Sequence, residues 1–190
     1  MADDAGAPGD GRPAAAGGGA SDPLFVVISG RPGSGKSTVA VQLAAALGLS
    51  LLAKDAIKQA LVNVLGAPDA EASRTLGRAA RHVLTTVAAT SAGAVLDSVW
   101  PPGDTAADAL RALPGTVVEV HCQVAPQLAA QRYRSREAGQ PGTEWPGRGE
   151  DEQARAGLAV AGGWPVLAVD TSAPVDVATV IARIRDVTAR

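Results

Sequence analysis

The chain has 190 residues, of which 46% are hydrophobic and 19% charged, and this length and composition predict one compact domain with a full core. With 17 Lys and Arg against 19 Asp and Glu, the formal net charge of -2 argues against binding nucleic acid or an anionic membrane through overall charge. The single Cys122 excludes an intramolecular disulfide and favours a reducing compartment. No apolar run reaches the roughly 18 residues of a membrane span, so a soluble cytoplasmic protein is expected.

The first 22 residues differ in composition from the rest of the chain. They are rich in Ala, Gly, Pro and Asp, and they lack the cationic start and apolar segment of a signal peptide. Such a composition cannot bury enough apolar surface to offset the entropy of ordering. We therefore expect a disordered tail over 1–22 and a folded domain over 23–190.

Short apolar runs alternate with stretches that have the 3.6-residue apolar period of helices. The expected strands are 24–28, 49–53, 94–97, 116–122 and 166–169. The expected helices are 36–47 with Gly48 as its C-terminal cap, 55–65, about 70–92 with Gly93 as its cap, 105–113, 126–137, 151–161 and 175–189. Strands separated by helices predict an α/β fold with three layers, in which a parallel sheet has helices on both faces and ligands bind at the carboxyl ends of the strands.

Residues 30–37 fit the pattern G-x-x-x-x-G-K-[ST] in full, between an expected strand and an expected helix. In this pattern glycines let successive N–H groups turn onto phosphate oxygens at the helix N-terminus. Lys36 is expected to reach the β- and γ-phosphates, and Ser37 to bind Mg²⁺, while Thr38 also starts the helix. The alternative is a glycine-rich turn without a ligand. The residues expected to bind nucleotide are Gly30, Arg31, Pro32, Gly33, Ser34, Gly35, Lys36, Ser37 and Thr38.

Two acids follow expected strands and would therefore meet at the carboxyl edge of the sheet. Asp55 could accept the proton of an attacking hydroxyl, or it could serve only as the N-cap of the next helix. Asp97 closes the apolar run Ala94-Val95-Leu96 and could hold a metal-bound water, or it could be a turn residue. The sequence thus predicts Asp55 as a base and Asp97, with Ser37, as the metal-binding pair.

A pair of arginines, Arg132 and Arg136, lies four residues apart late in the helix 126–137, hence on one face. They lead into a stretch rich in Gly, Pro and charge, which is predicted to be a lid over about 138–152. On a lid, the two guanidinium groups could clamp the phosphates as charge shifts to ADP, and Arg132 would also contact the nucleotide. The alternative is a solvated basic face at a helix C-terminus.

Other features carry weaker hypotheses. The arginines of the helix 70–92 could border an acceptor pocket, although a solvated face is the simpler interpretation. Trp100 could line the pocket, and His121 fits a satisfied core histidine. The arginines in question are Arg74, Arg78 and Arg81, next to His82.

The residues 29–38, 54–58, 95–97 and 169–171, together with the arginine pair, resemble the P-loop small-molecule kinases, which include chloramphenicol phosphotransferase, shikimate kinase and gluconate kinase. This resemblance covers about residues 24–188. It implies a P-loop fold with a five-stranded parallel sheet in the order 2-3-1-4-5, a lid, adenine near 172–175, and the catalytic residues Lys36, Asp55, Arg132 and Arg136. The Asp-x-Asp that follows the second strand of shikimate kinases is here Asp55-Ala56-Ile57, which argues against shikimate as acceptor.

The predicted function is an ATP- and Mg²⁺-dependent kinase that phosphorylates a hydroxyl of a small metabolite or antibiotic. Two alternatives stay open: a regulatory or toxin-like ATPase, and a 5′-hydroxyl kinase for RNA or DNA. The sequence shows no basic stripe that would favour the nucleic-acid substrate. Neither a membrane nor a nucleic-acid partner is expected.

Overall fold

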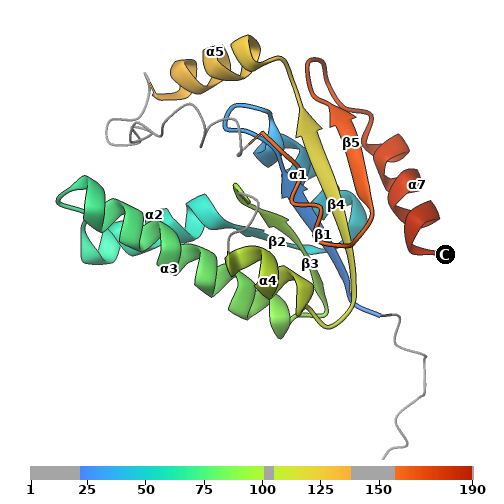
Figure 1. Cartoon of the computed structure of the whole chain (residues 1–190), viewed down its shortest axis with the longest axis horizontal. Coiled ribbons are helices and arrows are strands. Elements are labelled where there is room, and N and C mark those ends of the chain that lie inside the picture. Colours follow the sequence, from blue (N-terminus) through green and yellow to red (C-terminus); the bar gives the residue numbers. More distant parts are fainter. Residues whose placement is uncertain (1–21, 101–104, 138–156, 190) are drawn as a thin grey trace, which may run out of the picture.

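A computed structural model of the chain describes residues 22–100, 105–137 and 157–189. Five strands pair side by side in one parallel sheet, in the order β2-β3-β1-β4-β5 (Figure 1). The predicted fold class and strand order are therefore confirmed. In chain order the strands are β1 (Leu24–Ser29), β2 (Ser50–Ala53), β3 (Gly93–Asp97), β4 (Thr116–Gln123) and β5 (Val166–Asp170).

Helices lie on both faces of the sheet (Figure 1). Most begin and end within a few residues of the predicted bounds because their apolar period is clear. The described helices are α1 (Lys36–Leu47), α2 (Lys54–Leu65), α3 (Ala70–Ala89), α4 (Thr105–Arg111), α5 (Pro126–Glu137) and α7 (Val177–Thr188).

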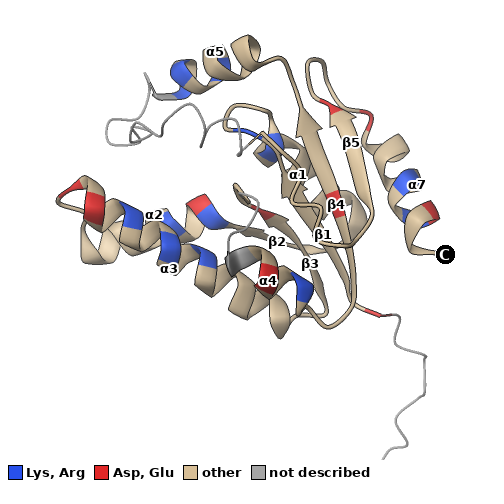
Figure 2. Ribbon diagram, in the orientation of Figure 1, with Lys and Arg blue, Asp and Glu red and all other residues tan. Residues whose placement is uncertain are grey.

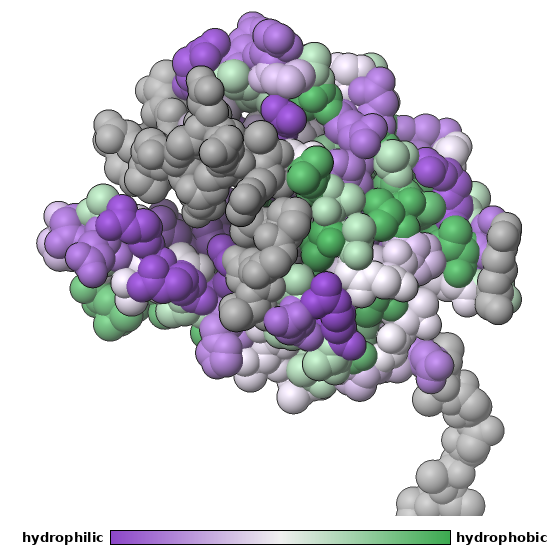
Figure 3. Space-filling model, viewed as in Figure 1, coloured by the Kyte–Doolittle hydropathy of each residue, from purple (hydrophilic) through white to green (hydrophobic). Residues whose placement is uncertain are grey.

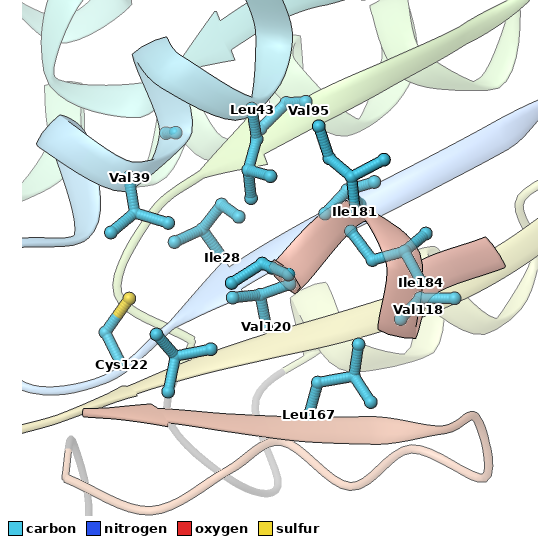
Figure 4. Close-up of a cluster of buried hydrophobic side chains, with 14 of the residues drawn as sticks. Ile28, Val39, Leu43, Val95, Val118, Val120, Cys122, Leu167, Ile181 and Ile184 are labelled. Atoms are coloured by element: carbon cyan, nitrogen blue, oxygen red, sulfur yellow. The ribbon is translucent and has the colours of Figure 1, made fainter. Parts of the chain in front are cut away.

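The central strand β1 divides the core into two clusters because successive side chains of a strand point to opposite faces. Val26 and Ile28 pack with α1 and α7, in the cluster shown in Figure 4. Phe25 and Val27 pack on the other face with residues of α3 and α4. All four side chains are fully buried. Because both faces of the strand are covered, its residues form a continuous apolar run rather than an alternating one.

Polar caps fix the ends of several helices. The Asp69 side chain accepts a hydrogen bond from the Ala72 N–H at 2.7 Å and caps α3, and Asp176 caps α7 in the same way. Gly48 ends α1 in the left-handed conformation, with φ of 66°. It is therefore the C-terminal cap that was predicted.

Three predictions about helix ends are wrong. Gly93 is the first residue of β3, and Thr90 ends α3 instead. Residues 157–161, the described part of the predicted helix 151–161, are not helical. Asp55 is not an N-cap, because Ala53 holds that position while it is still extended at the end of β2.

Several expectations fall on residues outside the described ranges. These are the tail over residues 1–21 and the lid over 138–152. Among the described residues, no helix combines the length and the apolar character needed to cross a bilayer.

Candidate nucleotide-binding and catalytic site

The glycine-rich loop links β1 to α1 and is shaped by two close approaches of backbone to backbone. Gly30, Gly33 and Gly35 all have positive φ, at 125°, 79° and 83°. A Cβ at Gly30 would overlap the Cys122 carbonyl, and a Cβ at Gly33 would overlap the carbonyl of Ala129 in α5. Glycine is therefore required here by both conformation and space.

Two polar side chains of this loop are buried, as a phosphate cradle requires. Lys36 is only 8% exposed, and its Nζ donates to the Arg31 carbonyl at 2.9 Å. Burial lowers the pKa of Lys36, although the negative charges of Asp97 and Asp55 oppose that effect. The Ser34 hydroxyl is fully buried, and it has no hydrogen-bond partner among the described residues. A loop with an unsatisfied buried hydroxyl, a buried ammonium group and glycines that permit close approach fits the phosphates of a nucleotide.

The structure brings the predicted metal-binding pair together. Asp97 is the last residue of β3, is 8% exposed, and lies close enough to the side chain of Ser37, in the first turn of α1, for the Ser37 hydroxyl to act on its carboxyl. Burial raises the pKa of the Asp97 carboxyl, while Ser37 and Lys36 oppose that rise. A hydroxyl beside one carboxylate matches the few protein ligands with which Mg²⁺ is held next to a nucleotide.

Asp55 lies at the same edge of the sheet. In the register of the β2–β3 pair, Ala53 lies beside Asp97. Ala53 ends β2, and Asp55 lies two residues later, in the first turn of α2. Its side chain is 89% exposed and pairs with Lys54, with 2.9 Å between Nζ and Oδ1. Loss of hydration beside neighbouring groups would by itself raise the pKa of Asp55, but the charges of Lys54, Lys36 and Lys58 outweigh that effect and lower the pKa. The carboxyl is therefore ionised at neutral pH.

Arg132 of α5 reaches the other side of the glycine loop. Its guanidinium donates to the carbonyls of Thr171, at 2.8 Å, and Ser172, at 3.1 Å. This contact ties α5 to the segment where the resemblance places adenine. Arg136, in the last turn of α5, is exposed, and its charge acts on both Lys36 and Asp97.

Thr171 was not among the predicted site residues, although the stretch 169–171 is part of the family resemblance. Its hydroxyl donates to the Ser34 carbonyl at 2.6 Å and lies 2.9 Å from the Gln123 carbonyl, which also accepts the Thr171 N–H. Thr171 thus joins the ends of β4 and β5 to the glycine loop. A hydroxyl residue directly after a buried strand, at the edge where ligands bind, is a signal that could have indicated it.

Glu119 was also missed. It is fully buried in β4, and its carboxylate accepts the N–H groups of Val160 at 2.8 Å and Ala161 at 2.9 Å, the Trp164 Nε1–H at 3.2 Å and the Ser29 hydroxyl. These contacts hold the segment before β5 to the residue that precedes Gly30. The sequence signal for this role was a single acid inside an apolar strand, because a buried carboxylate needs hydrogen-bond donors around it.

Two of the weaker hypotheses can be settled. Trp100 is a core residue, 2% exposed, and its indole N–H donates to the Ile28 carbonyl at 3.1 Å, so it does not line a pocket. His121 is buried with its Nδ1 at 2.9 Å from the Ser29 hydroxyl, as expected of a satisfied core histidine.

A protein-family model described as AAA domain matches residues 25–156. The chain belongs to this AAA domain family. The match contains the glycine loop, Asp55, Asp97, Arg132 and Arg136, whereas Thr171 lies beyond it. No curated protein sequence matches the chain.

Solved structures place this AAA domain chain among P-loop kinase folds. A protein from Chloroflexus aurantiacus named a "putative kinase" is 26% identical, with a TM-score of 0.74 over 87% of this chain and 96% of that one. A gluconokinase from Sinorhizobium meliloti is 20% identical, with a TM-score of 0.56 over 90% and 94% of the two chains. The Mycobacterium tuberculosis APS kinase CysC, solved with AMPPNP and APS, is 20% identical, with a TM-score of 0.54 over 90% and 99%. The chain thus has the ATP-binding P-loop fold of kinases.

Proposed function

We propose that this chain is an ATP-dependent phosphotransferase that moves the γ-phosphate to a hydroxyl of a small metabolite or antibiotic. The observation that carries the proposal is the position of Asp55 beside the glycine loop. Asp55, Lys36 and the Ser37–Asp97 pair all lie at the carboxyl ends of β1, β2 and β3, which are neighbours in the sheet. A phosphate site and an ionised carboxylate at one edge are what transfer to a hydroxyl needs.

Nucleotide binding is assigned to the glycine loop. Its N–H groups and the Lys36 ammonium would hold the phosphates, since Lys36 is fixed in the loop by its bond to the Arg31 carbonyl. The buried hydroxyl of Ser34, without a partner among the described residues, would gain one from a phosphate oxygen.

The residues that would hold Mg²⁺ are Ser37, through its hydroxyl, and Asp97, through a bound water. When bound, the ion neutralises charge on the β- and γ-phosphates. The two side chains are near neighbours, so one small ion could contact both.

In the reaction, the acceptor hydroxyl oxygen forms a bond to the γ-phosphorus while the bond from that phosphorus to the bridging oxygen of ADP breaks. The hydroxyl proton passes to a carboxylate oxygen of Asp55. Because Lys54 holds the pKa of Asp55 below its ordinary value, Asp55 is a weak base, and its main role is to orient the hydroxyl. This suits a loose transition state in which the proton leaves late.

The arginines of α5 would act on the nucleotide side. Arg132 lies beside Gly35 and the carbonyls of Thr171 and Ser172, so it is placed against the nucleotide rather than the acceptor. Arg136 acts electrostatically on Lys36 and Asp97, and its positive charge would stabilise the charge that develops on the leaving ADP.

The test is ADP release from ATP and Mg²⁺ with a panel of hydroxyl compounds, including sugars, sugar acids and hydroxylated antibiotics. We expect release to depend on at least one small acceptor and to disappear in Lys36→Ala. Release that no small acceptor stimulates would contradict the proposal and favour a regulatory ATPase. Transfer only to the 5′-hydroxyl of RNA or DNA would also contradict it.

A further inference from the structure

The first turns of α2 carry a cationic group around Asp55. Lys58 is four residues after Lys54 and three after Asp55, so the three side chains leave the helix on the same side. Lys54 pairs with the carboxylate at 2.9 Å, and the charge of Lys58 also acts on it. Two ammonium groups thus stand near a single carboxylate.

Both lysines are held against α3. The Lys54 side chain is 21% exposed and runs over Gly77, where an added Cβ would lie 3.9 Å from its Cε. Lys58 is half-buried and its Nζ donates to the Ser73 hydroxyl at 2.7 Å. Each ammonium group donates one hydrogen bond to a side chain of the described residues, and it has two more N–H donors for a ligand.

The cationic group is not balanced by its surroundings. Burial and the charge of Lys54 both lower the pKa of Lys58, with Asp55 opposing them, so the two ammonium groups repel each other. From Ser73 to Ala89, α3 has three arginines and no carboxylate. Lys and Arg therefore recur along the α2–α3 pair in Figure 2, and this side of the molecule is largely hydrophilic in Figure 3.

Resting on the proposed function, which makes Asp55 the partner of the acceptor hydroxyl, we propose that Lys54 and Lys58 bind an anionic group of the acceptor. The group is a carboxylate or a phosphate, because either accepts hydrogen bonds from two ammonium groups. Lys58 lies about one helical turn from Asp55, with roughly 5–6 Å between their Cβ atoms, so one small molecule could contact both side chains. The acceptor is then a small hydroxy acid or a hydroxylated phosphate ester.

Binding to the full chain, saturated with AMPPNP and Mg²⁺ so that the glycine loop is filled, tests this directly. The probes are two matched sets: glycerol, glycerate and glycerol 3-phosphate, and glucose, gluconate and glucose 6-phosphate. Calorimetry should show that a charged member of at least one set binds about tenfold or more tightly than its neutral parent. The carboxylate and phosphate arms identify which anion is preferred. Equal binding within both sets, or binding of none, would overturn the inference.

Variants separate ligand binding from helix packing. Lys58→Gln should lose the roughly tenfold preference for the charged probe, and Lys58→Arg should keep most of it. Arg185→Gln, on α7, changes the net charge equally and should keep all of it. Lys58→Gln with unchanged preference, whatever its melting temperature, would show that Lys58 only packs α2 on α3.

The two proposals can fail separately. Charge-selective binding without acceptor-dependent ADP release would leave the anion site standing and reject the kinase. Transfer to a charged acceptor that is as fast in Lys58→Gln as in the unmodified chain, with an equal KM for that acceptor, would leave the kinase standing and reject the anion site.

Discussion

Ser37 and Asp97 lie close enough for the Ser37 hydroxyl to act on the Asp97 carboxyl, although one is in the first turn of a helix and the other ends a strand. The two residues bring together α1, which follows the glycine loop, and β3, which lies next to β1 in the sheet. Their proximity places a hydroxyl and a buried carboxylate within the reach of one small cation. This contact is the geometric basis for the role assigned to both residues.

Asp97→Asn should separate metal binding from stability. We expect the Mg²⁺ concentration for half-maximal ADP release to rise about tenfold or more, because an amide oxygen replaces the carboxylate. The exposed control Asp108→Asn, on α4, should leave the Mg²⁺ requirement unchanged. An unchanged Mg²⁺ requirement in Asp97→Asn would assign Asp97 to structure alone.

The same variant gives a pH dependence with a definite sign. The pKa of Asp97 is raised in the folded state, so its stabilising contribution is complete below the unfolded pKa of about 4 and is lost as pH rises through the folded pKa. The neutral Asn avoids that loss. Asp97→Asn should therefore melt higher than the unmodified chain at pH 7 and equally at about pH 3.5, as measured by calorimetry without nucleotide.

Lys36→Ala should abolish phosphoryl transfer without harm to the fold. Lys36 is a desolvated charge whose ammonium group, within the described part of the chain, donates a hydrogen bond to the Arg31 carbonyl alone, so its removal relieves a burial cost. We expect a melting temperature equal to or above that of the unmodified chain, and no ADP release above background. Normal turnover in this variant would refute the phosphate cradle.

Asp55→Asn should slow transfer by roughly 10²–10⁴ and change ATP affinity only a fewfold. Because Ala53 and not Asp55 is the N-cap, and the pair with Lys54 is exposed, the melting temperature should barely move. Steady-state kinetics with a working acceptor, nucleotide binding and calorimetry on this one variant give all three values. A rate near normal would shift the proton-acceptor role to the γ-phosphate itself.

Thr171→Val should weaken nucleotide binding from outside the glycine loop. Valine has nearly the same shape but leaves the Ser34 carbonyl without its donor at 2.6 Å, a loss of about 1–3 kcal/mol of stability. The KM for ATP should rise severalfold while the KM for the acceptor stays constant. Thr171→Ser keeps the hydroxyl and should behave like the unmodified chain; if it does not, the methyl group and not the hydrogen bond positions the loop.

Most of the fold and the centre of the site follow from local sequence. The glycine loop is a contiguous pattern, and β1 and α1 are defined by apolar periods that neighbouring residues set. Glu119 could not be predicted in the same way, because the N–H groups that satisfy it come from Val160 and Ala161, far along the chain. Asp55 shows a different limit: the sequence left an N-cap open as the alternative to its predicted role as a base, and only the structure shows that α2 starts directly from the strand end, with Ala53 as the cap.

The contact between Gly33 and the Ala129 carbonyl has a mechanical consequence. Backbone meets backbone there, so no side chain can change rotamer to absorb a displacement of α5. A tilt of α5 would push on the loop that is assigned to the phosphates, and phosphates drawn into that loop would push on α5. Arg132 and Arg136 lie on this helix. The distance from their guanidinium groups to the phosphates therefore depends on the position of α5 as well as on the conformations of their own side chains.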